Sequence, residues 1–136
     1  MIIGNKDFEI GKRTYIMGIL NVTPDSFSDG GRFNDISAAI NRAKIMVAEG
    51  VDIIDIGGES TRPGHEDVSE EEEIKRVVPI IRELKKQLDI PISVDTYKGK
   101  VAELAIRAGA DMINDIWGFK MDPYIAVVAA KYNVPC

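Results

Sequence analysis

Short apolar runs alternate with longer amphipathic segments along most of the chain, from residue 14 onward. The apolar runs are nearly continuous, as parallel strands buried on both faces usually are, and the longer segments carry apolar residues at helical spacing. This alternation predicts a series of βα units. Strands are expected near 14–20, 52–57, 91–95 and 111–117, and helices near 36–49, 69–88, 98–108 and 123–132.

The first two predicted helices have recognisable ends and buried faces. The first ends at Gly50, and the second begins with Ser69 and Glu72 at the spacing of a capping box. Pro79 removes one backbone donor inside the second helix and predicts a bend or a boundary there. The positions expected to be buried are Ile36, Ala39, Ile40, Ala43 and Val47 in the first helix, and Ile74, Val77, Val78, Ile81, Leu84 and Leu88 in the second.

Polar residues predict the ends of the other two helices. Thr96 and Asp122 are expected to cap the third and fourth helices, and Gly109 to end the third. The acidic run at residues 70–73 is interpreted as a helix N-terminus whose negative charge complements the helix dipole.

Four βα units predict an α/β fold that forms the first half of an eight-unit TIM barrel of about 250 residues. Residues 133–136 are expected to begin a fifth strand. Residues 1–13 are expected to form a hairpin that plugs the bottom of the barrel, and residues 14–136 the half barrel itself. Because a half barrel exposes sheet edges and an apolar face, we expect a homodimer or pairing with the missing C-terminal half.

Composition narrows the possible functions. The chain has 136 residues, a formal net charge of −5 and no Lys/Arg cluster, which argues against a nucleic-acid partner. No apolar run approaches the roughly 20 residues that a membrane span needs, and the first residues carry charges where a signal peptide would be apolar. We therefore expect a cytoplasmic protein without a membrane partner that acts on small molecules.

Clusters of polar residues lie at or near the ends of all four predicted strands. Because parallel strands end at one edge of a sheet, the clusters are expected to converge at the C-terminal rim, where TIM barrels have their active sites. The first cluster is long and chemically varied for a connection, and it is interpreted as a closing active-site loop. The clusters are NVTPDSFSDGG at 21–31, GGESTRPG at 57–64, Asp95 with Thr96, and Asn114 with Asp115.

Several residues of the first two clusters have two interpretations. Asn21 could be a neutral oxygen ligand of a hard cation such as Mg²⁺, or an Asn that caps a turn. Asp25 and Asp29 could contact a substrate when the loop closes, or remain solvated. Arg62 could bind phosphate or belong to an ordinary surface loop. His65, the only histidine, lies among polar residues and is expected to be solvated.

Asp95 ends the apolar run at 91–95, and Asn114 interrupts the one at 111–117. Both are polar where a strand should be buried, and each therefore needs a partner. A carboxylate accepts from ring or amino N–H groups, and an amide both donates and accepts. The pair therefore suits one edge of a pterin-like or purine-like heterocycle. The alternative is internal capping, in which Asp95 accepts from its own downstream backbone.

Two long motifs resemble the signatures of dihydropteroate synthases. MGILNVTPDSFSDGG at 17–31 is similar to the first signature of that family, and DIGGESTRPG at 55–64 to the second. SVDT at 93–96 and IND at 113–115 are similar to further blocks of its pterin pocket. The resemblance implies a TIM-barrel transferase of folate biosynthesis that uses Mg²⁺. It would condense 7,8-dihydropterin-6-ylmethyl pyrophosphate with p-aminobenzoate to dihydropteroate and pyrophosphate.

The resemblance also implies roles for individual residues. Asn21 would be the magnesium ligand, Asp95 and Asn114 would hold the pterin, and Ile116 would line its slot. The implied catalytic residues are Asp95, Arg62 and Asp29. The residues implied for the aminobenzoate side, when both loops close, are Phe27, Ser28, Asp29, Thr61 and Pro63, with Arg62 as a pyrophosphate or loop contact.

The implied reaction needs no nucleophilic side chain, because pyrophosphate leaves first and the arylamine attacks with its own lone pair. Members of the family carry further substrate-binding residues on their last strands, so the 136-residue chain alone is expected to be inactive. The alternatives are a non-catalytic half barrel that binds pterin or self-assembles, and a pterin-binding methyltransferase barrel. The loop at 21–31 argues against the methyltransferase, which is not expected to need it.

Overall fold

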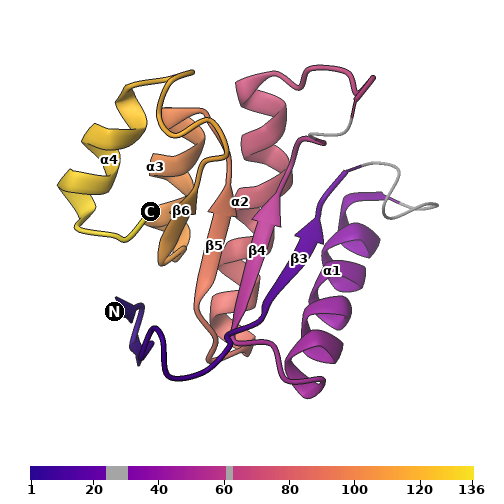
Figure 1. Cartoon of the computed structure of the whole chain (residues 1–136). Coiled ribbons are helices and arrows are strands. Elements are labelled where there is room, and N and C mark those ends of the chain that lie inside the picture. The colour runs from indigo at the N-terminus through magenta and orange to yellow at the C-terminus, as the bar shows by residue number, and fades with distance from the viewer. Residues whose placement is uncertain (24–30, 61–62) are drawn as a thin grey trace.

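Four parallel strands, each followed by a helix, form the body of the molecule (Figure 1). The computed structural model describes residues 1–23, 31–60 and 63–136. The strands pair in the order β3 (Met17–Asn21), β4 (Ile53–Gly57), β5 (Ile92–Asp95) and β6 (Met112–Asn114). The helices are α1 (Gly31–Ala48), α2 (Glu70–Gln87), α3 (Gly99–Ala108) and α4 (Tyr124–Tyr132). The predicted series of βα units is confirmed, and no described helix is long and apolar enough to cross a membrane.

The sheet has two different faces because successive side chains of a strand point to opposite sides. α1, α2 and α3 cover one face (Figure 1). The helix positions predicted to be buried pack there, together with Ile80, which the pattern did not single out. The strands contribute an apolar row in register, each member at most 2% exposed: Leu20, Ile56, Val94 and Ile113.

The opposite face of the sheet is not covered by a helix in the described part of the chain. Ile19 points to this side and is 62% exposed. A two-stranded hairpin of β1 (Ile2–Ile3) and β2 (Lys6–Asp7) lies at the end where the strands begin. It contacts the sheet through an apolar cluster that includes Ile3, Phe8 and Ile53. The hairpin thus leaves the opposite edge, where the strands end, uncovered.

α2 begins at the predicted capping box, in which the Ser69 hydroxyl accepts from the Glu72 amide at 3.2 Å. Pro79 lies inside α2, which continues to Gln87, so the predicted boundary is wrong. Pro79 forfeits one backbone hydrogen bond, but buried apolar residues on both sides of it hold α2 against the sheet. Such packing supplies most of the stability of a helix in a protein.

Asp122 contacts the first amides of two helices. Its Oδ1 accepts from the Tyr124 amide of α4 at 3.0 Å, as predicted, and its Oδ2 accepts from the Gly99 amide of α3 at 2.7 Å. Thr96 is not the cap of α3, contrary to the prediction. Its hydroxyl accepts from the Lys98 amide in the preceding turn, and the distant Asp122 takes the first helical amide instead.

Residues 133–136 do not form the predicted fifth strand. The carbonyl of Pro135 nevertheless accepts from the Ile113 amide of β6 at 3.0 Å. One such bond is too little to define a strand, but it places the segment beside β6.

Candidate active site at the strand ends

A single row of residues crosses the sheet where its strands end. Asn21 of β3 is in register with Gly57 of β4, Gly57 with Asp95 of β5, and Asp95 with Asn114 of β6. The row lies on the face that the helices leave open. The register therefore confirms that the strand ends converge, and it brings three of the predicted site residues into one line.

Gly57 keeps a space open between two of these residues. A methyl group at Gly57 would lie 3.5 Å from Asp95 Oδ2 and 3.6 Å from Asn21 Oδ1. The two oxygens therefore flank one spot on the sheet, and any larger residue at 57 would fill it. Asn21 is exposed at this edge, so that its amide oxygen is accessible.

The carboxylate of Asp95 has no hydrogen-bond partner among the described residues. Burial raises its pKa to about 6, and the negative charges of Asp55, Glu73 and Asp115 add to this effect. The alternative of internal capping does not hold, because Thr96 rather than Asp95 accepts from the backbone of the next turn. A partly buried carboxylate without a partner is suited to accept from a ligand.

Asn114 is held by a second buried carboxylate. Its Nδ2 donates to Asp55 Oδ2 at 3.0 Å, across β5. Asp55 is only 3% exposed, and burial raises its pKa, against the smaller opposing effect of the Ser93 and Asn114 side chains. Asp55 Oδ1 and Ser93 Oγ have no hydrogen-bond geometry to any described group. Two buried polar atoms beside Asp95 and Asn114 can therefore still form hydrogen bonds.

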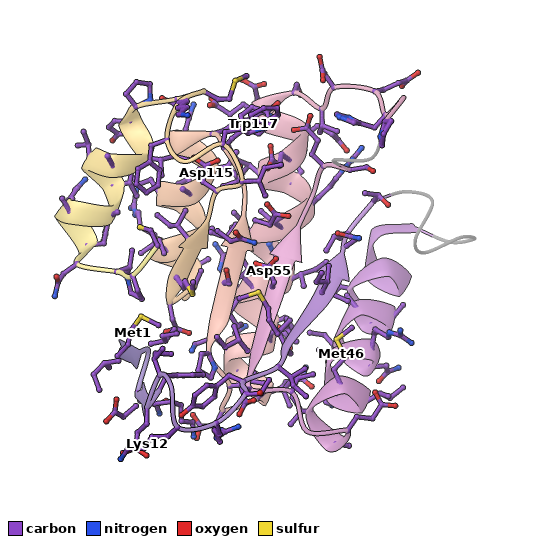
Figure 2. All side chains as sticks on the ribbon, viewed as in Figure 1. Met1, Lys12, Met46, Asp55, Asp115 and Trp117 are labelled. Carbon is purple, nitrogen blue, oxygen red and sulfur yellow. The ribbon has the colours of Figure 1, made fainter. Side chains whose placement is uncertain are left out.

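The rim beside this row is shaped by Asp115. Its carboxylate accepts from the amides of Trp117 at 3.0 Å and Phe119 at 2.7 Å, and the resulting turn ends β6 at Asn114 rather than at residue 117. Ile116 and Trp117 therefore leave the sheet, with 58% and 49% of their surface exposed, and line a pocket with Asp95. Figure 2 shows Asp115 and Trp117 at the rim and Asp55 in the middle of the sheet.

A family profile described as pterin binding enzyme matches residues 17–136. The chain belongs to the pterin binding enzyme family. The match begins at the first residue of β3 and includes all four members of the strand-end row.

Dihydropteroate synthases are among the pterin binding enzymes most similar to this chain. That of Clostridium beijerinckii is 71% identical over 100% of this chain, which covers 51% of the relative. The solved dihydropteroate synthase of Clostridium difficile, in the presence of pteroic acid, has 60% identity and a TM-score of 0.91 over 96% of this chain and 50% of that one. The solved dihydropteroate synthase of Xanthomonas albilineans with 4-aminobenzoic acid has 48% identity and a TM-score of 0.85. The match covers 91% of this chain and 45% of that one.

These relatives confirm the predicted fold class, since the neighbouring structures are TIM-barrel proteins. The chain spans about half the length of the curated relatives it matches.

The other predicted site residues belong to the first two polar clusters, at 21–31 and 57–64. Pro63 is exposed and borders a second opening near the start of α2. His65 is exposed, as predicted. The remaining predicted residues lie outside the described part of the structure: Asp25, Phe27, Ser28, Asp29, Thr61 and Arg62.

Beside the strand-end row lies a group of charged residues that the sequence analysis did not single out. Lys98 forms ion pairs with Glu59 and Glu73. The four acids at 70–73 lie in the first turn of α2, as predicted, but Glu73 is only 1% exposed and pairs with Lys98, which the sequence analysis did not foresee. Its helical spacing from Val77 was the available signal, because both lie on the buried side of α2.

Glu59, His65 and Asp67 each offer a ligand atom within 4.8 Å of the others, a spacing that suits a metal ion. Both oxygens of Glu59 are already occupied. Oε2 accepts from Lys98 at 2.8 Å, and Oε1 accepts from the Tyr97 hydroxyl at 3.3 Å. A cation would have to compete with the Tyr97 hydroxyl or with the Lys98 ammonium for Glu59, so this group is not a ready metal centre.

Proposed function

We propose that the chain forms the N-terminal half of a dihydropteroate synthase site. The complete enzyme would condense 7,8-dihydropterin-6-ylmethyl pyrophosphate with p-aminobenzoate, and release dihydropteroate and pyrophosphate. The observation that carries the proposal is the row of Asn21, Gly57, Asp95 and Asn114, in which Asp95 has no partner among the described residues. Similarity to synthases that were solved with pteroic acid and with 4-aminobenzoic acid supports the assignment of substrates.

The hydrogen-bonding groups of the row suit one edge of a pterin. The ionised Asp95 accepts two N–H donors. Because one N–H of Asn114 is committed to Asp55, its Oδ1 and its second N–H are left for the ligand. Ile116 adds an apolar wall beside Asp95, where a flat ring can lie. We assign pterin binding to Asp95, Asn114 and Ile116 on this basis.

In the proposed reaction, the bond between the pterin methylene carbon and the pyrophosphate oxygen breaks, and the bonding pair leaves with pyrophosphate. The positive charge is spread over the methylene and the pterin ring, and Asp95 stabilises it. The arylamine nitrogen then bonds to the methylene carbon and loses one proton. Arg62 would bind the departing pyrophosphate, and Asp29 would help to close the site.

Asn21 fits the role of a magnesium ligand, because its accessible amide oxygen lies at the edge where a pyrophosphate would meet the sheet. Mg²⁺ takes few protein ligands and completes its shell with water and phosphate oxygens. When bound, it would neutralise charge on the leaving group.

The aminobenzoate side of the site is assigned to the two loops. The residues are Phe27, Ser28, Thr61 and Pro63. Pro63 is exposed beside an opening that a small acid could enter. The assignment of the other loop residues rests on their motifs alone.

The 136-residue chain is expected to bind pterin without catalysing synthesis. Its sheet has four strands and an open face with Ile19 at its surface, where an eight-stranded barrel would be closed. We propose that this face pairs with a complementary half barrel or with a second copy in a homodimer, and that the protein works in the cytoplasm. The same open face favours the second candidate function, a non-catalytic pterin-binding module.

The test is the binding of pteroic acid to the chain, measured by titration calorimetry. The wild-type chain is expected to bind, and Asp95→Asn is expected to lose at least about tenfold in affinity, since a charged acceptor is replaced. Asp89→Asn, on an exposed loop at the other end of the sheet, is the matched control and is expected to bind normally. Failure of the wild-type chain to bind would overturn the proposal. Dihydropteroate formation by the chain alone would contradict the expected inactivity.

A further inference from the structure

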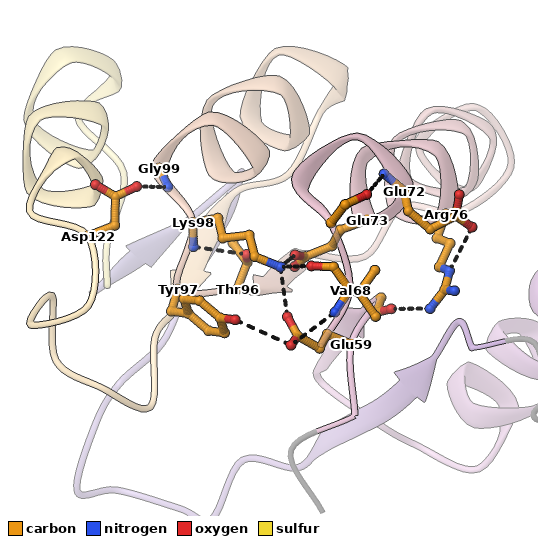
Figure 3. A network of polar contacts seen from close by, with 12 residues as sticks. Glu59, Val68, Glu72, Glu73, Arg76, Thr96, Tyr97, Lys98, Gly99 and Asp122 are labelled. Atoms are coloured by element: carbon orange, nitrogen blue, oxygen red, sulfur yellow. Dashed lines mark hydrogen bonds and ion pairs between the residues drawn. The ribbon is translucent and has the colours of Figure 1, made fainter. Parts of the chain in front are cut away.

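Lys98 lies at the centre of three short contacts (Figure 3). Its Nζ lies 2.8 Å from Glu59 Oε2, 2.7 Å from Glu73 Oε2 and 2.6 Å from the carbonyl oxygen of Val68. An ammonium has three N–H donors, and here each has one acceptor. Lys98 therefore has no donor left for a ligand, and it can act on a site only through the groups that it holds.

The three acceptors come from different parts of the chain. Glu59 and Val68 lie near the two ends of the connection between β4 and α2, and Glu73 lies in the first turn of α2. Lys98 directly precedes α3. One ammonium thus ties both ends of the connection to the starts of two helices.

Further hydrogen bonds support the same arrangement. The Tyr97 hydroxyl donates to Glu59 Oε1 at 3.3 Å, and the guanidinium of Arg76 donates to the carbonyl of Gly58 at 2.9 Å. Glu59 and Tyr97 line the same pocket as Asp95. The position of the connection therefore decides the shape of one wall of that pocket.

The charges of this cluster are buried. The exposed fractions of the side chains are 15% for Lys98, 6% for Glu59 and 1% for Glu73. Burial lowers the pKa of Lys98, but both carboxylates oppose this and raise it overall, so the group stays charged at neutral pH. Because desolvation offsets the attraction, such a cluster is weak evidence for stability. What it does supply is a defined geometry, since Lys98 is the cation that pairs with both buried carboxylates in the described part of the chain.

We propose that Lys98 is a positioning residue, which holds the described ends of the β4–α2 connection and so sets the pocket wall that Glu59 and Tyr97 form. The inference rests on the proposed function, because the same connection carries Pro63 and Val68, which border the opening assigned to the aminobenzoate part of the substrates. Lys98 then contributes to the affinity of a ligand that reaches the connection. It does not contribute to the affinity of one held by Asp95 and Asn114 alone.

The first experiment measures hydrogen–deuterium exchange of the 136-residue chain. In Lys98→Met, the amides of residues 68–73 are expected to exchange at least about tenfold faster, because those of Val68, Glu72 and Glu73 donate to acceptors that Lys98 helps to hold, while those of β4 and β5 keep their protection. Lys100→Met is the matched control, since Lys100 is 60% exposed and lies 3.8 Å from Glu70, and it is expected to exchange like the wild type. Unchanged exchange at 68–73 in Lys98→Met would overturn the proposal.

A neutral variant separates positioning from the cost of buried charge. Lys98→Met with Glu59→Gln and Glu73→Gln leaves no charge in this cluster unpaired, so it is expected to fold even where Lys98→Met does not. Its residues 68–73 are still expected to exchange fast, because no ammonium then joins the three acceptors and only the long contact of 3.5 Å between the Val68 amide and the side-chain oxygen of residue 59 is left. Slow exchange in this triple variant would mean that Lys98 only compensates charge, and the proposal would be abandoned.

The second experiment compares two probes, 6-hydroxymethylpterin and pteroic acid, which adds the aminobenzoate part. In the triple variant, the affinity for pteroic acid is expected to fall by about tenfold or more, and that for 6-hydroxymethylpterin to stay within about twofold. Equal losses for both probes would show general damage and count against positioning. If the wild-type chain binds neither probe, the proposed function fails, and the exchange data still decide the role of Lys98.

Discussion

Asn114 Nδ2 donates a hydrogen bond of 3.0 Å to Asp55 Oδ2, although the two residues lie on strands that are not neighbours. Asn114 is in register with Asp95 of β5, and Asp55 of β4 with Ser93 of β5, so the bond crosses the intervening strand diagonally. One N–H of the amide is thereby committed, and the orientation of the whole group is set. Asp55 also contributes negative charge that raises the pKa of Asp95.

Asp55→Asn is expected to separate these two effects. The new amide oxygen still accepts from Asn114, so the affinity for 6-hydroxymethylpterin at neutral pH is expected to change by less than about threefold. The pKa of Asp95 is expected to fall below about 6, because one repelling charge is gone. Carbon-detected NMR titration of the carboxyl groups measures this shift. An unchanged Asp95 pKa in Asp55→Asn would show that the two carboxylates are not coupled.

The pKa of Asp95 predicts how stability depends on pH. The pKa is about 6 in the fold against 3.8 for the ordinary side chain, so the folded state binds the proton more tightly. Below about pH 4 the group is protonated in both states and carries no penalty. As the pH rises from 4 to 6, the free energy of unfolding is expected to fall by about 1–3 kcal/mol, and the loss remains at higher pH.

Urea unfolding of the wild type and Asp95→Asn, at intervals from pH 4 to pH 8, measures this contribution. The difference between the two proteins is the informative quantity, since burial also raises the pKa of Asp55. Asp95→Asn is expected to be more stable than the wild type at pH 7 and to lose this advantage near pH 4. Parallel pH profiles for the two proteins would contradict the assignment to Asp95.

The ionisation of Asp95 also predicts how binding depends on pH. A pterin N–H needs the carboxylate as its acceptor, so affinity for 6-hydroxymethylpterin is expected to rise by up to about tenfold per pH unit below 6 and to level off above 7. Fluorescence titration follows the affinity. Asp95→Asn is expected to bind weakly with little pH dependence, and a full pH dependence in that variant would assign the proton to another group.

Two adjacent glycines are expected to respond to alanine in opposite ways. A methyl group at Gly57 meets only ordinary contacts, the nearest at 3.5 Å, but it occupies the space between Asp95 and Asn21. Gly57→Ala is therefore expected to keep its stability within about 1 kcal/mol and to lose affinity for pteroic acid. A methyl group at Gly58 would lie 2.9 Å from Val77 and 3.1 Å from Glu73.

Gly58→Ala is accordingly expected to destabilise the fold by about 1–3 kcal/mol, because an overpacked core must shift. Urea unfolding and calorimetric binding on both variants test the pair. If Gly57→Ala binds pteroic acid like the wild type, the space above Gly57 is not part of the ligand site.

Asp122→Ala removes the acceptor for the first amides of α3 and α4. Because both amides would lose a charged cap, the free energy of unfolding is expected to fall by about 1–3 kcal/mol. Asp122→Asn keeps one acceptor oxygen and is expected to lose less. Chemical unfolding measures both, and a loss in Asp122→Ala of under about 0.5 kcal/mol would show that water replaces the cap.

Local sequence patterns determined the repeated units of this protein and the place of its site. Nearly continuous apolar runs and helical periodicity predicted all four βα units, because these signals depend on each segment's own residues. Polar residues at the end of an apolar run, or interrupting one as Asn114 does, predicted the rim positions of Asn21, Asp95 and Asn114, since parallel strands share one edge. The motifs around them indicated the family, which the profile match confirmed.

Only the tertiary structure decided which polar groups meet. Glu73 looked like one of four similar acids at a helix start, and burial beside Lys98 distinguishes it. Asp122, and not Thr96, accepts from the first amide of α3, because folding brings the start of α4 beside the start of α3. Asp115 ends β6 at Asn114 because its carboxylate accepts from two nearby amides. Hydrogen-bond partners, burial and pKa values depend on contacts between distant segments, which periodicity and spacing do not encode.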